Sequence, residues 1–280
     1  MMWIVCNDSE ITNIKYSISL YNDSSEKMDA IDSESVACIV TSPPYFNYIN
    51  YGGVGIGSES VYSDYINNLK KVFTESYRVL LKGGTFCMNI TNMKSRVKTD
   101  KSSFLHSIAA DVTKLMQNTG FIFFDEIVWI KADANNGALK GKPLFGSYPY
   151  PPTPKILDSI FENILIFKKP GKRIPMPKEI KEKSKLTKEE WQVFTKGIWN
   201  IIPDRKAKHP ATFPFEIPYR LIKMYSFVDD LILDPFSGSG TTLLASYKLN
   251  RRAVGFEINE GYVFETMERF NVDAYNKTKC

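Results

Sequence analysis

The stretch LILDPFSGSGTTLLASYKL, residues 231–249, predicts the local fold of the carboxyl-terminal part of the chain. The apolar run 231–233 is typical of a buried strand, and residues 241–249 are typical of a helix. A turn that contains Gly238 and Gly240 joins the two segments. A strand, a glycine turn and the start of a helix bring backbone N–H groups and the positive helix end to a ligand. The stretch therefore indicates a ligand-binding turn in an α/β fold.

Two common nucleotide-binding loops do not match this turn. A P-loop ends in Gly-Lys followed by Ser or Thr, whereas Gly240 is followed directly by Thr241. A dinucleotide fingerprint has a third glycine three residues after the second, where this chain has Leu243. The turn is therefore expected to hold a small ligand that carries neither a triphosphate nor a dinucleotide pyrophosphate.

Two carboxylates near this turn indicate the chemistry of the ligand. Asp234 ends the first strand and is placed to pair with an ammonium group. Glu257 ends the next expected strand, 17 residues after Gly240, and a carboxylate at that position can accept two hydrogen bonds from ribose hydroxyls. A ligand with a ribose, an ammonium group and no phosphate suggests S-adenosylmethionine.

Alternating strands and helices extend the pattern over most of the chain. The expected strands are residues 36–40, 85–90, 121–130, 160–167, 231–233 and 253–257, and the expected helices are 61–81, 104–117, 216–225 and 241–249. The strands 121–130 and 160–167 are apolar enough to be buried on both faces. This order predicts an α/β fold, a mostly parallel sheet with helices on both faces, that binds ligands at the carboxyl ends of its strands.

Composition limits the class of protein. The chain has 280 residues, of which 43% are hydrophobic, and its net charge of +5 is compatible with a polyanionic partner. Four scattered cysteines and two histidines predict neither a disulfide framework nor a metal site. The first residues lack a basic region followed by an apolar run, and no apolar stretch is long enough to span a membrane. The expected location is the cytoplasm.

A second motif, TSPPY at residues 41–45, directly follows the expected strand 36–40. Proline fixes φ and lacks an N–H, so the two prolines make a stiff corner that is rich in acceptors. The Ser42 hydroxyl and the Pro43 carbonyl could together hold both protons of an exocyclic amino group, and Tyr45 offers a ring for stacking. Two fixed acceptors would aim the nitrogen lone pair at a methyl sulfonium, which is catalysis by orientation and electrostatics.

Together, these motifs resemble those of the amino-group DNA methyltransferases of bacterial restriction-modification systems. The similarity is to their β class, in which the catalytic motif precedes the cofactor motif, and it covers most of the chain. The segments that carry it are TSPPY at 41–45, Asn22-Asp23 where the family has Gly-Asp, RVLLKGG at 78–84 where the family has RVLKPGG, HPATFP at 209–214, DPFSGSGTT at 234–242 and GFEIN at 255–259.

The resemblance implies a Rossmann-like, S-adenosylmethionine-dependent methyltransferase fold with a circularly permuted motif order and no metal. In this family Asp23 would contact the cofactor adenine, and residues 209–214 would close over its methionine part. The catalytic residues implied are Ser42, Pro43, Pro44 and Tyr45. The cofactor-binding residues implied are Asp23, His209, Pro210, Phe213, Asp234, Pro235, Phe236, Ser237, Gly238, Ser239, Gly240, Thr241, Thr242 and Glu257.

The same resemblance divides the chain. Residues 1–167 are expected to form the catalytic half of the methyltransferase domain, 168–208 a small target-recognition insert, and 209–280 the cofactor-binding half of the same domain. The insert contains the basic segment 168–196, with ten Lys or Arg against four Asp or Glu, although such a charge run alone is typical of a solvated surface helix. Other candidates for DNA contact are residues 48–57 and 135–150. The implied partners are double-stranded DNA and a cognate restriction endonuclease, for a monomer or a homodimer.

Ser42 also bears on the target base. In the family, Ser at this position usually accompanies cytosine-N4 methylation and Asp accompanies adenine-N6 methylation, so cytosine-N4 is favoured and adenine-N6 stays open. Either base would have to be flipped out of the duplex. Carbon-5 methylation is disfavoured because none of the four cysteines follows a proline. A catalytically silent DNA-binding module and an RNA or protein amide methyltransferase remain as alternatives.

Overall fold

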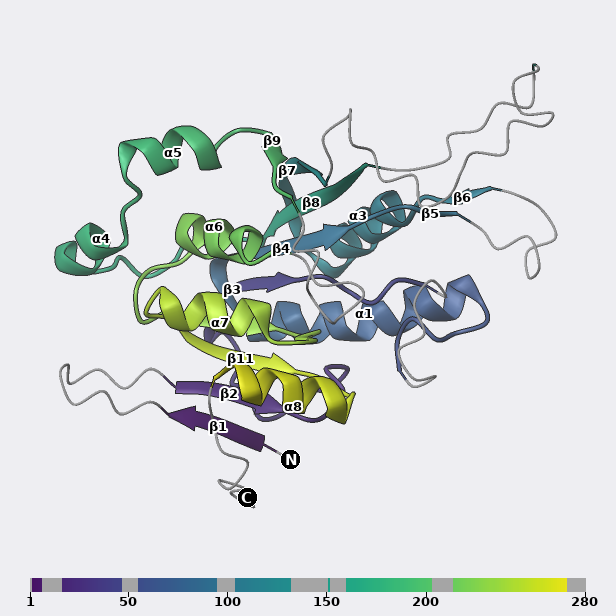
Figure 1. Cartoon of the computed structure of the whole chain (residues 1–280), viewed down its shortest axis with the longest axis horizontal. Coiled ribbons are helices and arrows are strands. Elements are labelled where there is room, and N and C mark those ends of the chain that lie inside the picture. The colour runs from purple at the N-terminus through teal and green to yellow at the C-terminus, as the bar shows by residue number, and fades with distance from the viewer. Residues whose placement is uncertain are drawn as a thin grey trace.

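The computed structural model describes residues 2–6, 17–46, 55–94, 104–131, 151, 160–202 and 214–270. Its central feature is a nine-stranded sheet with the strand order β1-β2-β11-β10-β3-β4-β8-β7-β9 (Figure 1). The strand bounds are β1 Met2–Cys6, β2 Ser17–Tyr21, β3 Val36–Thr41, β4 Leu80–Ile90, β7 Ile122–Ile130, β8 Phe161–Lys168, β9 Ile198–Asn200, β10 Leu231–Asp234 and β11 Arg252–Phe256. A separate small sheet pairs β5 Met93–Lys94 with β6 Leu105–His106.

The directions of the strands make the sheet mostly parallel, as the sequence predicts. β2, β11, β10, β3 and β4 form a continuous parallel block, whereas β1 runs antiparallel to β2, and β8 runs antiparallel to both β4 and β7. All five strands of the block therefore end at one edge of the sheet, which we call the carboxyl edge. The opposite edge, where they begin, is the amino edge.

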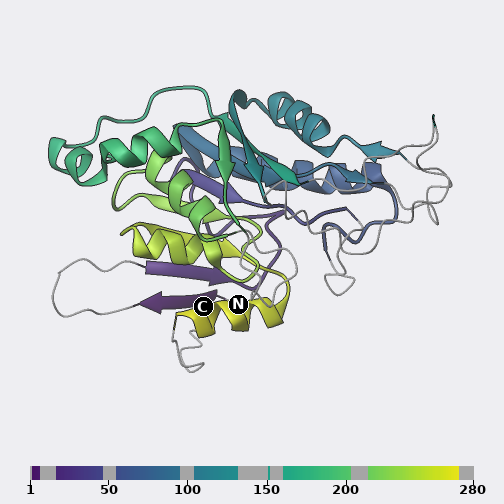
Figure 2. The same cartoon turned by 45° about the horizontal axis from the view of Figure 1, so that its top comes forward.

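Helices cover both faces of the sheet (Figure 2). The helix bounds are α1 Tyr62–Val79, α3 Ile108–Thr119, α4 Lys178–Ser184, α5 Lys188–Phe194, α6 Glu216–Tyr225, α7 Thr241–Lys248 and α8 Glu260–Arg269. One apolar core joins α1 and α3 to side chains such as Ile39 of β3, and a second joins α6, α7 and α8 to Cys38 and Val40 of the same strand. Alternate residues of β3 thus face opposite cores, as the period of two in a strand requires.

The first helix shows how the sequence sets this packing. Tyr65, Leu69, Val72 and Phe73 recur at helical spacing and are all fully buried, so α1 presents one apolar stripe to the sheet. The helix ends slightly earlier than expected, because Leu80 is already in extended conformation and begins β4. Consequently RVLLKGG forms the junction between α1 and β4 and lies partly within the strand.

Two further expectations are corrected. The strand at 121–130 is not buried on both faces, since Ile122 and Phe124 are 53% and 49% exposed. The reason is that β9 pairs only with Val128–Ile130, so the first half of β7 has no neighbouring strand on that side among the described residues. The helix expected from residue 104 begins at Ile108, because Leu105 and His106 pair with β5 instead. The remaining expected strands and helices are confirmed, with small differences at their ends, and β1, β2, β5, β6, β9 and α8 were not predicted.

The turn between β10 and α7 depends on Gly240. Its φ is +76°, and a Cβ there would lie 2.4 Å from Cγ2 and 2.9 Å from Oγ1 of Thr266 in α8. The Thr266 hydroxyl donates to the Gly238 carbonyl at 3.1 Å, so any displacement of Thr266 also disturbs the turn.

We expect Gly240→Ala to lower the free energy of unfolding by about 1–3 kcal/mol, because it combines an unfavourable φ with steric overlap. Urea denaturation measures the loss. Gly197→Ala is the matched control, because a Cβ at Gly197 meets nothing within 4 Å and should change stability by less than about 0.5 kcal/mol. Equal effects of the two substitutions would contradict this account of the turn.

Candidate functional site

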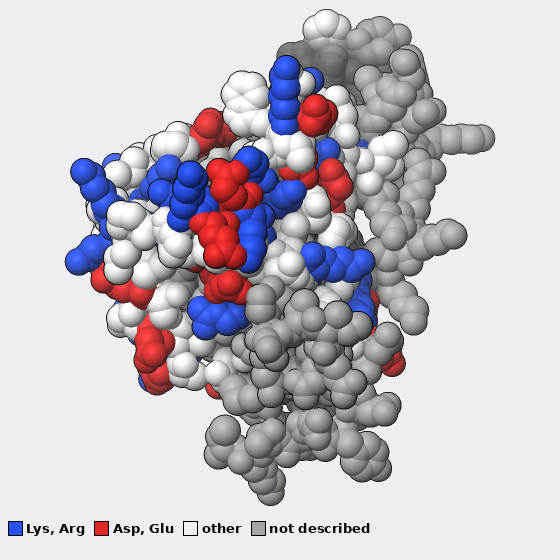
Figure 3. Space-filling view, turned by 90° about the vertical axis from the view of Figure 1, so that its left-hand side faces the viewer, with Lys and Arg blue, Asp and Glu red and all other residues white. Residues whose placement is uncertain are grey.

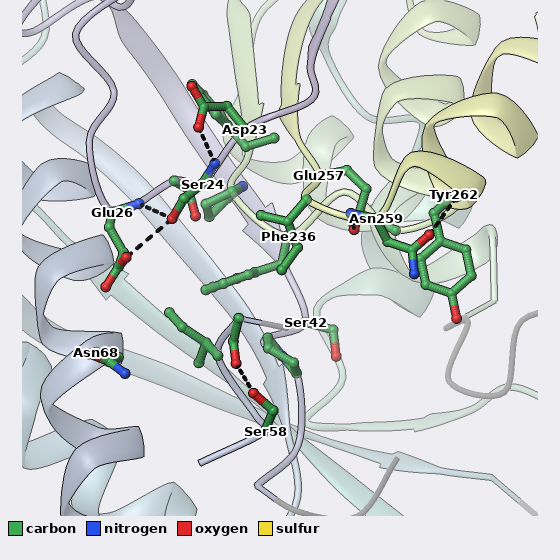
Figure 4. Close-up of a pocket in the computed structure, with 18 of the residues that line it drawn as sticks. Asp23, Ser24, Glu26, Ser42, Ser58, Asn68, Phe236, Glu257, Asn259 and Tyr262 are labelled. Atoms are coloured by element: carbon green, nitrogen blue, oxygen red, sulfur yellow. Dashed lines mark hydrogen bonds between the residues drawn. The ribbon is translucent and has the colours of Figure 1, made fainter. Parts of the chain in front are cut away.

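A cavity of about 490 Å³ opens at the carboxyl edge of the sheet, where β2, β3, β10 and β11 end (Figure 4). Predicted residues from four separate segments line it: Asp23 after β2, Ser42 and Pro44 after β3, Pro235, Phe236 and Gly238 after β10, and Glu257 after β11. Parallel strands end at the same edge, so residues more than two hundred positions apart meet there. Both predicted motifs therefore face one cavity.

Glu257 is an anionic group that the fold holds firmly on the cavity wall. One of its carboxylate oxygens accepts from the Gly238 N–H at 2.8 Å, and the other accepts from the Asn259 N–H, also at 2.8 Å. Burial raises the pKa of this carboxyl, and the two backbone donors partly offset that shift. Each oxygen keeps a further lone pair, so the group can still accept hydrogen bonds from a ligand.

The loop after β2 closes the cavity beside Glu257. The Asn22 side chain donates to the carbonyls of Glu257, at 2.9 Å, and of Ile258, at 3.2 Å. Asn22 stands where the resembling family has Gly, and its amide gives that departure a structural role, because it ties this loop to the end of β11. Asp23 accepts from the Ser24 N–H at 2.7 Å and is one of the residues that line the cavity.

Asp234 lies behind the cavity and is not among the residues that line it. The residue is 1% exposed, and its Oδ1 accepts from the Thr41 hydroxyl at 2.6 Å and from the Phe236 N–H at 3.1 Å. Burial raises the pKa of the Asp234 carboxyl to about 6, although bonds from Thr41, Thr242 and Phe236 act against the shift. In this arrangement the carboxylate holds β10 to β3, and its predicted pairing with a ligand ammonium group stays a prediction.

The remaining residues of the glycine-turn motif support the turn from behind. Ser237, Ser239, Thr241 and Thr242 are buried and do not line the cavity. Thr242 donates to the Val40 carbonyl at 3.3 Å, and Thr241 accepts from Arg269 of α8 at 3.1 Å. These contacts fix the turn against its neighbours. The predicted residues His209, Pro210 and Phe213 lie outside the described residues.

The proline corner divides between the cavity and the core. Ser42 and Pro44 line the cavity, whereas Pro43 and Tyr45 are buried. Tyr45 is 8% exposed, and its hydroxyl donates to Glu162 of β8 at 3.0 Å. The Pro44 carbonyl accepts from the Tyr65 hydroxyl of α1 at 3.1 Å. The corner is therefore anchored from both sides, and a stacking role for Tyr45 stays a prediction.

Several functional candidates were not predicted from the sequence. Asn259 and Tyr262 at the start of α8, Glu59 and Asn68 near α1, and Ser24 and Glu26 after β2 also line the cavity. Asn259 ends the GFEIN segment of the family resemblance and is the N-cap of α8, where its side chain accepts from the Gly261 N–H at 2.9 Å. Glu162 and Asn89, which contact the corner from β8 and β4, had one weak signal: each is a polar residue next to a mostly apolar run of its strand.

The described part of the predicted recognition insert begins at the opposite edge of the sheet. Lys168 at the end of β8 pairs with Thr85 near the start of the parallel part of β4, so α4 and α5 follow at the amino edge. Basic and acidic side chains alternate on this side of the molecule (Figure 3), and ion pairs join Lys223 to Glu190 and Arg173 to Asp230. The chain returns toward the carboxyl edge through β9, which runs parallel to β7.

No group of three or more His, Cys, Asp or Glu side chains in the described part of the chain is arranged to hold a metal ion. None of the described helices is both long and apolar enough to cross a membrane.

Comparisons with known proteins find relatives that are similar in sequence and in fold. The N6/N4 methyltransferase family model, described as DNA methylase, matches residues 36–268. The type II methyltransferase M.MjaI of Methanocaldococcus jannaschii is 33% identical over 268 residues, which cover 84% of each chain. A putative DNA modification methylase of Thermus thermophilus, solved in complex with S-adenosyl-L-methionine, is 31% identical with a TM-score of 0.73, over 90% of this chain and 92% of that one.

A more distant structure shares the fold. The PvuII DNA methyltransferase, described as cytosine-N4-specific, is 18% identical to this chain, with a TM-score of 0.62. The alignment covers 93% of this chain and 88% of that one.

The buried Asp234 gives the folded protein a specific pH dependence. Its folded-state pKa of about 6 lies above the ordinary value of 3.8, so its contribution to stability is fully present below the ordinary value and is lost as pH rises through 6. Relative to Asp234→Asn, the wild-type free energy of unfolding should fall by about 2 kcal/mol between pH 4.5 and pH 8. Urea denaturation of both proteins at each pH measures this difference, and a difference independent of pH would contradict it.

Proposed function

This chain belongs to the N6/N4 DNA methylase family, and from that premise we propose that it transfers a methyl group from S-adenosylmethionine to the exocyclic N4 amino group of cytosine in double-stranded DNA. The observation that carries the proposal is that Ser42 of the proline corner and Glu257 of the cofactor motif line one cavity. A methyl donor and an amino acceptor bound by these two motifs would share one space.

The residues present fit the cofactor. Glu257 supplies carboxylate oxygens for the ribose hydroxyls, and Phe236 supplies a ring beside them on the cavity wall. Asp23 supplies an acceptor for the adenine amino group. The Gly238 N–H already donates to Glu257, so this glycine holds in place the carboxylate that would bind the ribose. When bound, S-adenosylmethionine supplies an electrophilic methyl group on a sulfonium.

The proline corner would prepare the amino group for attack. Its lone pair is delocalised into the base, so the nitrogen is a poor nucleophile until its protons are held out of the plane. The Ser42 hydroxyl and the Pro43 carbonyl would accept hydrogen bonds from the two N–H groups, and the prolines fix the positions of both acceptors. The chemistry then depends on orientation and electrostatics, with no covalent enzyme intermediate.

The target base is proposed from Ser42. Ser at the first position of the motif favours cytosine-N4 in the resembling family, and the same two acceptors would also serve adenine-N6. The base would be flipped out of the duplex to reach the cavity, at a cost of a few kcal/mol. We retain residues 168–208 as the proposed recognition insert, and the return of the chain through β9 favours residues 197–202 over α4 and α5 as part of its base-reading surface.

The relatives suggest a biological setting. M.MjaI is described as a type II methyltransferase, so we propose that this chain protects DNA against a cognate restriction endonuclease.

The ribose role predicts the effect of Glu257→Gln. Loss of the charged acceptor should weaken cofactor binding about 10- to 100-fold, because hydrogen bonds to a charged group contribute about 1.5–3 kcal/mol. The wild-type affinity should also fall as pH is lowered through the raised pKa of Glu257, whereas the variant should lack this dependence. Calorimetric titration with S-adenosylhomocysteine measures both. Glu260→Gln, an exposed neighbour in α8, is the control and should bind like wild type.

Nucleoside mass spectrometry tests the reaction. Purified protein, S-adenosylmethionine and unmethylated genomic DNA should yield N4-methylcytosine after digestion, and Ser42→Ala should yield at least about 100-fold less while still binding cofactor. N6-methyladenine would keep the mechanism and change the target. Neither product in DNA, with cofactor binding verified, would reject DNA methylation and favour an RNA or protein substrate or a silent DNA-binding module.

A further inference from the structure

A buried carboxylate stands behind the proline corner. The Glu162 side chain, in β8, is 7% exposed, and its Oε2 accepts from Asn89 Nδ2 at 2.5 Å and from the Tyr45 hydroxyl at 3.0 Å. Its Oε1 accepts from Lys131 Nζ at 2.6 Å. Three donors from β4, from the corner and from the end of β7 therefore converge on one carboxylate that does not line the cavity.

The chemistry of the carboxylate sets the orientation of Asn89. A carboxylate only accepts hydrogen bonds, so Asn89 must present its amide nitrogen to Glu162. The same nitrogen donates to the Ser42 Oγ at 3.4 Å. The amide oxygen of Asn89 is buried and has no partner among the described residues, and the reverse orientation would place it against Glu162. Glu162 thus decides which end of the amide meets Ser42.

This orientation constrains the Ser42 hydroxyl. A hydroxyl has one proton and two acceptor lone pairs. Because Asn89 occupies one lone pair, the other lone pair and the proton remain for groups in the cavity. Ser42 can then accept a hydrogen bond from an N–H of an exocyclic amino group and donate one to the ring nitrogen next to it.

We propose that Glu162 is a positioning residue for methyl transfer, which it serves by orienting Ser42 through Asn89 and by holding Tyr45 through its hydroxyl. This proposal rests on the proposed function, because Ser42 is the group through which it acts. Burying an ion pair commonly stabilises a protein no more than apolar packing does. We therefore assign to Glu162 the role of orienting the hydrogen-bond donors around it, and not that of stabilising the fold.

The test compares Glu162→Gln with wild type in single-turnover methylation at saturating cofactor and DNA. A glutamine presents a donor as well as an acceptor to the three donors around it, so we expect the rate to fall about 10- to 100-fold while cofactor affinity stays within about twofold. Asn89→Ala keeps the Glu162–Lys131 pair and should give a similar loss of rate. In a Ser42→Ala background, Glu162→Gln should add less than about threefold.

Asp230→Asn is the matched structural control. Asp230 is 8% exposed and forms a two-point pair with Arg173, at 2.7 and 2.9 Å, at the amino edge. Its loss should lower the melting temperature without changing the rate of the folded enzyme. Wild-type rates in both Glu162→Gln and Asn89→Ala, or fully additive effects with Ser42→Ala, would overturn the proposal while the proposed function stands. A wild-type protein that methylates no DNA would overturn both.

Discussion

The hydrogen bond from the Thr41 hydroxyl to Asp234, 2.6 Å long, holds together the two motifs on which the site depends. Thr41 is the last residue of β3 and directly precedes Ser42. Asp234 is the last residue of β10 and directly precedes the glycine turn. The two strands are parallel neighbours, so the bond joins their carboxyl ends. With Thr242 bonded to Val40, it sets the distance between the proline corner and the glycine turn.

That constraint explains why Asp234 differs from the expectation drawn from its sequence. A carboxylate at the end of a strand, next to a glycine turn, looks available to a ligand. The structure shows that the same position also faces the neighbouring strand, where Thr41 offers a hydroxyl. Burial raises the pKa of Asp234, and the group stays in place because three donors surround it. The tertiary structure determines which strand lies beside the end of another, and the residue spacing within one motif does not predict this.

The sequence was informative where a local rule decides the outcome. Apolar runs and helical spacing located β3, β10, α6 and α7 closely, and the order of strands and helices indicated the mostly parallel sheet. It placed Ser42 and Glu257 at one edge because parallel strands end together. It could not show that Glu162 and Asn89 lie beside each other, because that depends on the antiparallel pairing of β8 with β4. In this register Asn163 lies opposite Ile90, and these two residues directly follow Glu162 and Asn89 in the chain. Nor could the sequence show that β9 leaves half of β7 uncovered.

The strand order also has a consequence for how the protein is made. β10 and β11 come from the last part of the chain, yet they lie between β2 and β3, which come from the first part. A nascent chain that has emerged from the ribosome only as far as β9 therefore has nothing to join β2 to the rest of the sheet. The centre of the sheet is completed last, by pairings between residues about two hundred positions apart. Non-local closure of this kind slows folding, so exposed strand edges must be kept from aggregating during synthesis.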